Sequence, residues 1–364
     1  MKTRAALFRG AGQPLEVREI ELREPRPHEV LVRVRAVGIC GTDLHVVKGE
    51  WDRPKPMVLG HEGAGTVEAV GARVESLEPG DDVVLSWAPS CRRCADCRRG
   101  RPAACIELQR AIGAGTLLDG TTGMQTDGET VYRGTATGAL CEWLTVDADV
   151  ALPVGDEIPL EHAALLGCAA LTGVGAVLFQ ARPEPGSTVL VIGAGGVGQF
   201  CVQGARIAGA AEIVAVDPVE ARLEQAARVG ATRLTTPEAL PEALREIAPD
   251  GADTALDAVG APETTALALR WTKNGGRTVL VGLPAAGERL DLDPAEFVRR
   301  EKELTGSMYG SEDPRRALPV LLEHVRSGSL KLEPLVGPTF ALDDVNDAVA
   351  ASLAGSPGRV VVVP

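Results

Sequence analysis

Aromatic residues, lysine and long apolar runs are all scarce in this sequence. Only 3% of the 364 residues are aromatic, and 50 acidic residues against 37 basic ones give a formal net charge of −13. Nucleic acids and anionic membrane surfaces require clustered cationic side chains, so this balance argues against both as partners. No stretch of about 18 apolar residues is present to span a bilayer, and no apolar run of signal-peptide type follows Met1 and Lys2. We therefore expect a cytoplasmic protein that binds neither nucleic acid nor a membrane.

Cysteine, by contrast, is concentrated in one place. Four of the eight cysteines are spaced as Cys91-x2-Cys94-x2-Cys97-x7-Cys105. Because thiols stay reduced in the cytoplasm, this crowding predicts metal ligands rather than disulfides. Ferredoxin-type iron–sulfur clusters also use Cys-x2-Cys-x2-Cys, but with a shorter fourth spacing and a following proline that are both missing here. The pattern predicts a structural Zn²⁺, with every coordination position filled by sulfur and none left for a substrate.

The length of the chain predicts two domains, because it exceeds what one ordinary core accommodates. Residues 30–84 contain short β-rich runs broken by turn signals such as Pro79-Gly80, which indicates a mostly antiparallel unit. Between about 91 and 138 apolar periodicity fades, and we expect a loop-dominated lobe there. After Pro185-Gly186 six apolar strands alternate with helices, which predicts a doubly wound parallel sheet.

The elements of this second half can be placed approximately. The six expected strands are STVLVIG, EIVAVD, ATRLTT, ADTALDA, RTVLVG and ELTGSM. Helices are expected at about 196–209, 220–230 and 315–326, and closing strands near 339–340 and 360–363.

A glycine-rich fingerprint follows the first of these strands. In Gly193-Ala-Gly195-Gly-Val-Gly198, the first glycine permits the tight turn, the second lets backbone N–H groups approach a pyrophosphate, and the third allows close helix packing. Asp217 ends the next strand, about 20 residues on, where its carboxylate can bind ribose hydroxyls and repel a 2′-phosphate. The alternative is a glycine-rich turn that binds no nucleotide. Strand, helix and acidic residue in register favour NAD, in preference to NADP.

Two more motifs lie near the start of the chain. Cys40 occurs in Gly-Ile-Cys-Gly-Thr-Asp-Leu-His, and His61 in Gly-His-Glu-Gly-Ala-Gly, continuing to Gly71 and Val74. With the segment around Cys168, the four-cysteine lobe and the glycine-rich loop, the sequence resembles the zinc-containing medium-chain alcohol dehydrogenases over essentially its whole length. Their signature GHE-x2-G-x5-G-x2-V is matched at every fixed position, and the long lobe is similar to class III and liver-type members and their bacterial relatives.

This resemblance implies a GroES-like, mostly antiparallel β catalytic domain and a Rossmann cofactor domain. The catalytic domain is expected at 1–169, with the structural-zinc lobe at about 91–138, and is completed by 309–364. The NAD-binding domain is expected at 170–308. Since edge strands of cofactor domains pair across a two-fold axis in this family, the resemblance also implies a homodimer, with a tetramer as the alternative.

The resemblance further implies a catalytic zinc held by Cys40, His61 and Cys168. A Cys2His set leaves one position open for water or substrate, and the Lewis acid eases loss of the alcohol proton before hydride passes to NAD. Glu62 is expected behind the metal as an alternative or outer ligand. Asp43 is expected to orient His61 through its free ring nitrogen.

A proton relay and the remaining cofactor contacts are implied in the same way. Thr42 matches the hydroxyl that takes the alcohol proton and passes it through the nicotinamide ribose toward His45. The implied cofactor-binding residues are Gly193, Gly195, Gly196, Val197, Gly198, Asp217, Arg222, Thr172 and Arg359. The chain departs from liver-type enzymes at Gly41, where those enzymes often carry a cationic phosphate contact, so cofactor affinity is expected to differ.

The substrate is less constrained by the sequence. Trp51 and Trp87 fall on substrate-pocket positions of the family, which favours a primary aryl or allylic alcohol and its aldehyde, unless both side chains belong to the core. Class III members act on a thiol–formaldehyde adduct and grip its carboxylate with a lobe arginine. Here that region reads Gln109-Arg110, one position displaced, so the thiol-adduct function stays open.

Two other interpretations are weaker. A zinc polyol dehydrogenase would carry Glu at the third ligand position, where this chain has Cys168. A non-catalytic nucleotide- or zinc-binding protein would be expected to have lost a ligand or the relay hydroxyl, yet Cys40, Thr42 and His61 are all present. Cys141 and Cys201 have no role in the scheme and are expected to be buried packing residues.

Overall fold

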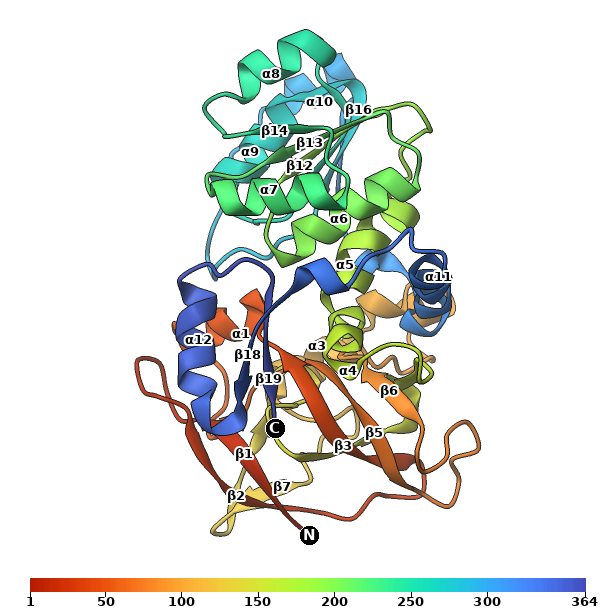
Figure 1. Ribbon diagram of the computed structural model, residues 1–364, viewed down its shortest axis with the longest axis vertical. Coiled ribbons are helices and arrows are strands. Elements are labelled where there is room, and N and C mark those ends of the chain that lie inside the picture. Colours follow the sequence, from red (N-terminus) through yellow and green to blue (C-terminus); the bar gives the residue numbers. More distant parts are fainter. The chain divides into compact units, whose positions relative to one another are not determined.

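Two largely antiparallel sheets build the first unit of the chain, and one parallel sheet builds the second. The computed structural model describes every residue from 1 to 364. Unit 1 contains residues 1–168, 313–318 and 336–364, and unit 2 contains residues 169–312 and 319–335 (Figure 1).

The first sheet of unit 1 joins the start of the chain to the cysteine-rich lobe. Its strand order is β8 (Glu129–Thr130), β7 (Met124–Thr126), β2 (Glu16–Leu22), β1 (Lys2–Phe8), β4 (Met57–Val58) and β9 (Tyr132–Arg133). All of its pairs are antiparallel except β4 with β9.

The second sheet carries most of the unit 1 core. Its order is β11 (Ala151–Pro153), β6 (Asp82–Leu85), β5 (Glu62–Val70), β3 (Glu29–Gly38), β19 (Arg359–Val363) and β18 (Val336–Ala341), and β10 (Trp143–Asp147) also pairs with β3. Along β3, Val32 and Val34 are buried while Arg33 and Arg35 are exposed. This alternation is what a strand with one face on a core requires. The mostly antiparallel β unit expected from the sequence is confirmed.

Short helices connect these strands. They are α1 (Gly41–Val47), α2 (Ala95–Arg98), α3 (Ile106–Ala114), α4 (Leu160–Ala163) and α12 (Val345–Leu353). The lobe at 91–138 is more regular than the loop-dominated one expected, because it contains α3 and the strands β7, β8 and β9. Leu108 and Ala111 lie three residues apart on α3 and are both buried, so this helix has a small apolar face of its own.

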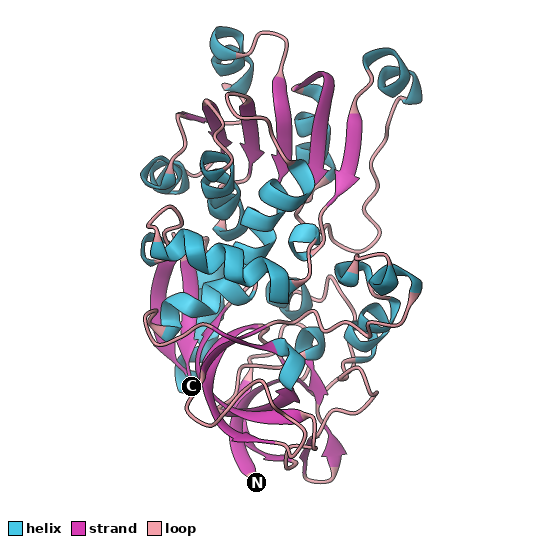
Figure 2. Ribbon diagram, turned by 90° about the vertical axis from the view of Figure 1, so that its right-hand side faces the viewer, coloured by secondary structure: helices cyan, strands magenta, loops and turns pink.

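Unit 2 has the doubly wound sheet expected from the sequence. The six parallel strands have the order β14 (Arg233–Thr235), β13 (Glu212–Val216), β12 (Thr188–Ile192), β15 (Ala252–Asp257), β16 (Thr272–Leu280) and β17 (Glu303–Gly306). Figure 2 shows these arrows side by side and pointing the same way. Both faces of β12 are buried, which explains its unbroken apolar run Val189-Leu-Val-Ile192.

The helices of unit 2 follow the alternating pattern. They are α5 (Ala169–Gly175), continued by a π-helical segment (Ala176–Ala181), then α6 (Gly196–Ile207), α7 (Glu220–Val229), α8 (Leu240–Ile247), α9 (Pro262–Arg270) and α10 (Pro294–Arg300). Helices α6 and α7 contact β13, and α9 contacts β15 and β16. The order 3-2-1-4-5-6 puts the first strand in the middle of the sheet, beside the point where the chain reverses its winding direction.

The return of the chain after residue 309 differs from the expected division. We expected all of 309–364 in the catalytic domain, but residues 309–312 and 319–335 belong to unit 2. Most of helix α11 (Pro314–Arg326) falls in this second stretch. The side-chain amide of Gln203 on α6 exchanges hydrogen bonds with the backbone of Lys331 at 3.0 and 2.7 Å, and Gln225 donates to the Pro334 carbonyl at 2.6 Å. Gln203 and Gln225 are polar residues on helices, and the helical pattern of the sequence gives no sign that their side chains bind a distant segment.

No single helix of this structure is long and apolar enough to cross a membrane. One bent pair, Leu160–Gly167 with Ala169–Ala181, meets the length and composition requirement when taken together.

Candidate active site

Three side chains that are far apart in the sequence meet inside unit 1. The Sγ atoms of Cys40 and Cys168 and a ring nitrogen of His61 all lie within 4.8 Å of one another. The three residues are 7%, 5% and 1% exposed, respectively. Two thiolate donors and one imidazole donor suit Zn²⁺, and three ligands are fewer than its usual four. The arrangement therefore fits a zinc ion with a position left open.

Local structure places each of these groups. Cys40 caps the N-terminus of α1, His61 lies between β4 and β5, and Cys168 follows the 3-10 helix Ala164–Gly167. Gly167 packs where an added Cβ would lie 2.8 Å from the carbonyl oxygen of Leu85, so no larger residue fits there without a shift of backbone. Cys168 therefore enters the site from a segment pressed against β6.

Asp43 organises the site from the first turn of α1. Its carboxylate accepts hydrogen bonds from the backbone N–H of Cys40 at 3.1 Å and of Gly60 at 3.0 Å, and its Oδ1 lies 3.3 Å from Nδ1 of His61. Since Nδ1 faces Asp43, Nε2 of His61 is left for a metal. Burial opposes protonation of His61, but Asp43 and Cys40 outweigh it and raise the pKa of this imidazole well above its usual value.

The two sulfurs interact directly with each other. A hydrogen bond from Cys168 holds the pKa of Cys40 well below its ordinary value, while the same bond and burial raise the pKa of Cys168. Sulfurs that compete for one proton in a buried space form a site that a divalent cation can stabilise by replacing that proton.

The buried Glu62 and the partly buried Arg359 form an ion pair next to this cluster. Arg359 Nε lies 2.9 Å from Glu62 Oε1, and its Nη1 donates to the Ile39 carbonyl at 3.1 Å. Burial raises the pKa of Glu62 to about 7, and the positive charge of Arg359 acts against that rise. Gly38 makes room for the pair, because a Cβ there would lie 2.6 Å from Glu62 Oε1. The Oε2 atom of Glu62 is buried without a hydrogen-bond partner, which fits the alternative or outer metal ligand expected from the sequence.

The four cysteines of the lobe form a second cluster. The Sγ atoms of Cys91, Cys94, Cys97 and Cys105 all lie within 4.8 Å of one another. Backbone N–H groups point at three of these sulfurs: Cys94 N–H at Cys91 Sγ (3.3 Å), Cys97 N–H at Cys94 Sγ (3.5 Å) and Cys91 N–H at Cys105 Sγ (3.4 Å). The bond from Cys97 N–H lowers the pKa of Cys94 to about 6. Donors aimed at sulfur favour thiolates, so this loop suits a closed tetrahedral zinc site.

The glycine-rich loop of unit 2 has the backbone expected of a nucleotide-binding turn. Gly193 has φ +87°, and a Cβ on Gly198 would lie 1.7 Å from the Gly193 carbonyl oxygen, so both positions exclude a side chain. Gly195 caps the N-terminus of α6, and Gly196 and Val197 begin that helix. Thr172 lies on the neighbouring α5, which packs against α6.

Asp217 lies beside this loop at the end of β13. Its Oδ2 accepts a hydrogen bond from Ala194 N–H and its Oδ1 one from Val219 N–H, both at 2.9 Å. Arg222 Nη1 lies 3.6 Å from the same carboxylate. The sequence predicted a ribose ligand at this position, and the structure adds that Asp217 also holds the loop in place.

The expected relay and pocket residues lie on and around α1. Thr42 occupies the first turn of α1, two residues after Cys40. His45 lies further along the helix and stacks on Trp51, with ring centroids 4.5 Å apart. Trp87 is 8% exposed and meets His61 edge to face at 6.2 Å. Trp87 thus lies beside His61, a candidate metal ligand, whereas Trp51 lies beside His45, the expected relay residue.

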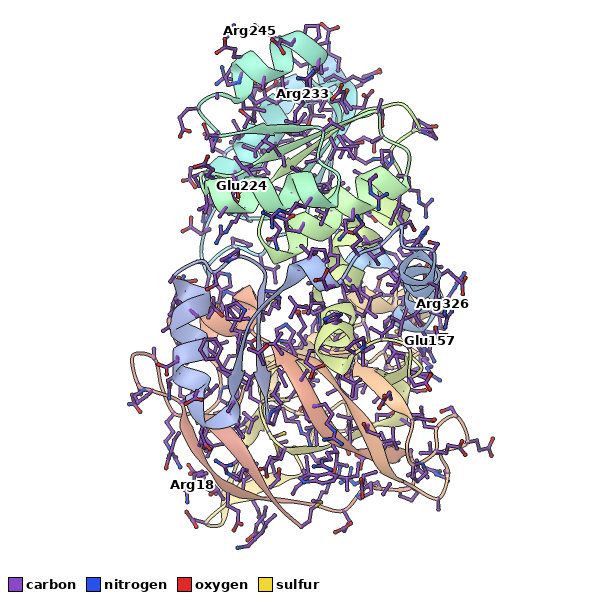
Figure 3. All side chains as sticks on the ribbon, in the orientation of Figure 1. Arg18, Glu157, Glu224, Arg233, Arg245 and Arg326 are labelled. Carbon is purple, nitrogen blue, oxygen red and sulfur yellow. The ribbon has the colours of Figure 1, made fainter.

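The ionisable groups of these clusters differ from the ordinary surface charges. Figure 3 shows Glu224 on α7 and Arg245 on α8 at the periphery of unit 2, and both are exposed. Asp43 and Glu62 are 3% and 0% exposed. Burying a carboxylate is costly unless it is paired and hydrogen-bonded, and both acids meet this condition, Asp43 with two backbone N–H groups and His61, and Glu62 with Arg359.

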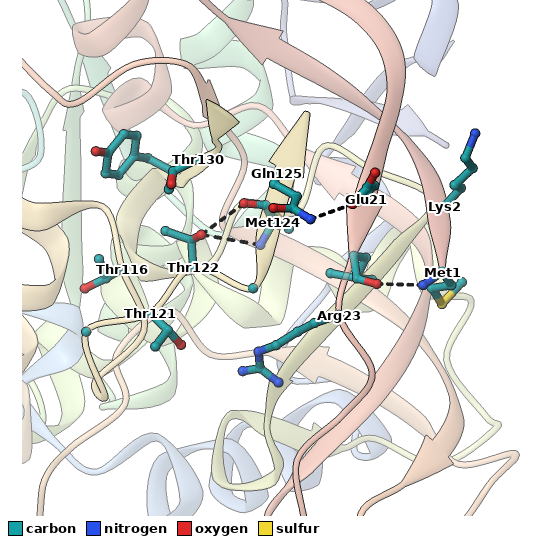
Figure 4. A pocket seen from close by; sticks show the side chains of 14 residues that line it. Met1, Lys2, Glu21, Arg23, Thr116, Thr121, Thr122, Met124, Gln125 and Thr130 are labelled. Carbon is teal, nitrogen blue, oxygen red and sulfur yellow. Dashed lines mark hydrogen bonds between the residues drawn. The ribbon is translucent and has the colours of Figure 1, made fainter. Parts of the chain in front are cut away.

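A separate polar cavity of about 790 Å³ lies between the start of the chain and the lobe. Figure 4 shows Arg23, Thr121, Thr122 and Gln125 around it. Gln125 donates to Glu21 at 2.5 Å. None of the candidate metal ligands lines this cavity, so it is distinct from both metal clusters.

Sequence reasoning missed several buried polar residues. Arg133 is fully buried and donates to the carbonyls of Thr122 and Thr137, and burial lowers its pKa to about 10. Asp257 is fully buried and accepts from the N–H groups of Val259 and Gly260. Neither residue belongs to a recognisable motif, and an isolated Arg or Asp in a sequence is most simply interpreted as a surface charge.

Comparison with known proteins identifies the family. Residues 26–156 match the alcohol dehydrogenase GroES-like domain, and residues 196–323 match the zinc-binding dehydrogenase domain. An S-(hydroxymethyl)glutathione dehydrogenase of Escherichia coli is 36% identical over 100% of both chains. Among solved structures, benzyl alcohol dehydrogenase from Acinetobacter calcoaceticus is 31% identical with a TM-score of 0.94, covering 100% of this chain and 99% of that one. A zinc-binding dehydrogenase from Sinorhizobium meliloti bound to NADP is 28% identical with a TM-score of 0.83, covering 100% of both chains.

The family domains, the two cysteine-containing clusters and the parallel sheet all agree with the resemblance found in the sequence. The chain belongs to the zinc-containing alcohol dehydrogenases of the medium-chain family, and it is an oxidoreductase.

Proposed function

We propose that this enzyme interconverts a primary alcohol, aryl or allylic, and its aldehyde, with NAD as the hydride acceptor. The observation that carries the proposal is the convergence of Cys40, His61 and Cys168 in a buried position with three ligands and no fourth. A zinc ion bound there supplies a Lewis acid that eases loss of the alcohol proton. Cys91, Cys94, Cys97 and Cys105 hold a second, structural zinc.

The protein side chains then have separate tasks. Asp43 fixes the orientation of His61, and Glu62, neutralised by Arg359, occupies the buried space behind the ligands. Thr42 takes up the proton of the alcohol hydroxyl as its own hydroxyl proton passes on toward His45, and His45 releases a proton to water at the end of the relay. Trp87, beside His61, supplies an aromatic surface for a flat substrate, and Trp51, stacked on His45, is the second proposed pocket residue.

NAD is proposed as the cofactor on the basis of the loop around Asp217. The Asp217 carboxylate accepts two backbone N–H groups beside the glycine-rich loop, and a 2′-phosphate placed there would be repelled by it. Arg222, 3.6 Å away, weakens that repulsion. The other proposed contacts are Gly193, Gly195, Gly196, Val197, Gly198 and Thr172. Arg359 is a weaker candidate for the pyrophosphate, because it is engaged by Glu62.

A thiol–formaldehyde adduct is the alternative substrate, since the curated relatives have that activity in their names. The expected carboxylate grip from the lobe lacks support, because Arg110 is exposed and paired with Glu107 at 2.9 Å. A thiol-dependent reaction would therefore need another cation.

The edge of the parallel sheet supports a proposed homodimer. Strand β17 ends the sheet and pairs only with β16, so its outer side has unused backbone donors and acceptors. Light scattering on the purified enzyme would measure the mass directly. The free thiols required for both zinc sites fit a reducing compartment, and we propose the cytoplasm.

One experiment tests the main proposal. Purified enzyme is assayed against benzyl, allyl and short aliphatic alcohols, and against formaldehyde with and without glutathione, each with NAD and NADP. Zinc per chain is counted before and after chelation. We expect two zinc ions per chain, loss of activity when one is removed, and preference for NAD with aromatic alcohols. Full activity in a metal-free enzyme would contradict the proposal.

A further inference from the structure

The turn after α1 folds two side chains onto His45. The His45 carbonyl accepts hydrogen bonds from the backbone N–H groups of both Glu50 (2.9 Å) and Trp51 (3.4 Å). Gly49 has φ +77°, which reverses the chain direction at this point. As a result the Glu50 carboxylate reaches Nδ1 of His45, and the Trp51 ring stacks on the imidazole with an interplanar angle of 15°.

These contacts fix which ring nitrogen of His45 faces Glu50. An ionised carboxylate is only an acceptor, so the proton between the two groups belongs to Nδ1 of His45. The hydrogen bond from His45 lowers the pKa of Glu50, which keeps this carboxylate ionised. In a neutral ring with its proton on Nδ1, Nε2 carries a lone pair and can accept a proton. The His45 side chain is 23% exposed, so solvent reaches the ring.

The surrounding charges do not replace Glu50 in this role. Lys48 Nζ lies 3.7 Å from Glu50 Oε1, and the Arg53 guanidinium lies 5.5 Å from the Trp51 ring centroid. Both are cations, and neither can stabilise a protonated His45. The acidic partner of His45 in this structure is Glu50.

We infer that Glu50 is a positioning residue for the proton relay: it sets the tautomer and orientation of His45 and stabilises the imidazolium that forms when Nε2 accepts the proton. The inference rests on the proposed function. In each turnover, the O–H bond of the alcohol would break and its proton would pass by way of Thr42 to Nε2, while the hydride would leave with the C–H electron pair to bound NAD. The imidazolium then releases the proton to water, and Glu50 stays ionised throughout. Trp51 restricts the ring to the plane in which Nδ1 faces Glu50.

A variant series tests this role through kinetics. Glu50→Gln keeps the shape and removes the charge, Glu50→Asp keeps the charge on a shorter side chain, and Glu75→Gln serves as the control. Glu75 is an exposed glutamate that forms no hydrogen bond or ion pair with another side chain. We expect Glu50→Gln to lower kcat for alcohol oxidation by about tenfold with little change in KM for the alcohol, since the carboxylate acts on proton transfer and not on binding.

Two further results are expected from the same series. Amine buffers at rising concentration should restore much of the lost kcat in Glu50→Gln, because an external base can accept the proton, and should leave the wild type unchanged. Glu50→Asp should recover part of the rate without added base. A Glu50→Gln enzyme with wild-type kcat, or one whose rate does not respond to buffer, would overturn the inference.

A measurement without turnover separates this inference from the proposed function. Long-range ¹⁵N NMR reports which ring nitrogen of a histidine carries the proton, and the chain has only 5 histidines to assign. We expect the Nδ1–H tautomer for His45 in the wild type and its loss in Glu50→Gln, with His45→Gln identifying the signal. An Nε2–H tautomer in the wild type would overturn the inference even if the enzyme is active. An Nδ1–H tautomer in an enzyme that oxidises no alcohol would instead refute the proposed function alone.

Discussion

Replacing Asp43 by Asn should loosen the catalytic zinc while leaving the zinc of the four-cysteine lobe in place. Asp43 is 3% exposed and contacts three groups: the backbone N–H of Cys40, the backbone N–H of Gly60 and Nδ1 of His61. Asparagine has nearly the same shape but one acceptor oxygen and no charge. It therefore cannot serve all three contacts, and it can turn an N–H group toward a donor.

The size of the effect follows from these contacts. Loss of an outer carboxylate partner of a metal-bound histidine typically weakens metal affinity by about 10–100-fold. That range corresponds to about 1.4–2.7 kcal/mol, which is close to the worth of one hydrogen bond to a charged group. We therefore expect one strong contact to be lost and the fold to survive.

The two metal sites of one chain make the assay self-controlled. Zinc release into a chelator of graded strength should show two steps, and Asp43→Asn should shift only the first. Asp52→Asn is the matched control, because the Asp52 side chain is 94% exposed and contacts Lys55 at the surface. If both steps kept their wild-type positions in Asp43→Asn, or if both moved together, Asp43 would not be the group that orients His61.

Three other predictions concern a buried ion pair of unit 1 and the nucleotide-binding loop of unit 2. Glu29 receives a two-pronged ion pair from Arg23 at 2.5 and 2.6 Å; burial alone would raise the pKa of Glu29, but Arg23 and the Arg26 N–H outweigh it and hold that pKa below 4.5. The ion pair therefore stabilises the fold fully above pH 4.5, and this stabilisation is lost as the pH falls through the lowered pKa of Glu29. Thermal melts should show that Glu29→Gln has a lower Tm than the wild type at pH 7 and that the two Tm values converge at acid pH. Gly198→Ala puts a Cβ 1.7 Å from the Gly193 carbonyl oxygen, and should abolish NADH binding in a fluorescence titration while both zinc ions are retained. Asp217→Asn should raise kcat/KM for NADP relative to NAD by about tenfold or more; an unchanged ratio would mean that the charge of Asp217 does not select the cofactor.

Sequence patterns predicted the parts of this protein that depend on local order. The strands β12 and β13 could be located because each is an apolar run, and the more polar β14 and β17 were placed by the alternation of strands with helices. The two zinc clusters were predicted from spacing in one case and from family motifs in the other. In both clusters the ligands are cysteine and histidine, which are the usual zinc ligands, so their occurrence in a protein with reduced thiols already indicates a metal site.

Features that depend on distant or irregular contacts could not be predicted. Arg359 pairs with Glu62 across 297 positions of sequence, and nothing local marks either residue as the partner of the other. Glu50 is near His45 in sequence, but its carboxylate reaches the ring only because the backbone reverses at Gly49 after the end of α1. Residues 319–335 group with unit 2, and the side-chain amides of Gln203 and Gln225 that bond to this stretch carry no distinctive pattern in the sequence.

The ion pair between Glu62 and Arg359 has a consequence for the order in which the protein matures during translation. A ribosome that has made residues 1–168 has already produced all three candidate zinc ligands and the carboxylate of Glu62. The guanidinium that neutralises this carboxylate is made only with β19, whose Val361 pairs with Gly38 next to it. The emerging chain can therefore bind a metal ion before Arg359 is available to pair with Glu62. The charge of Glu62 is compensated only when the last strand, β19, has been made and paired.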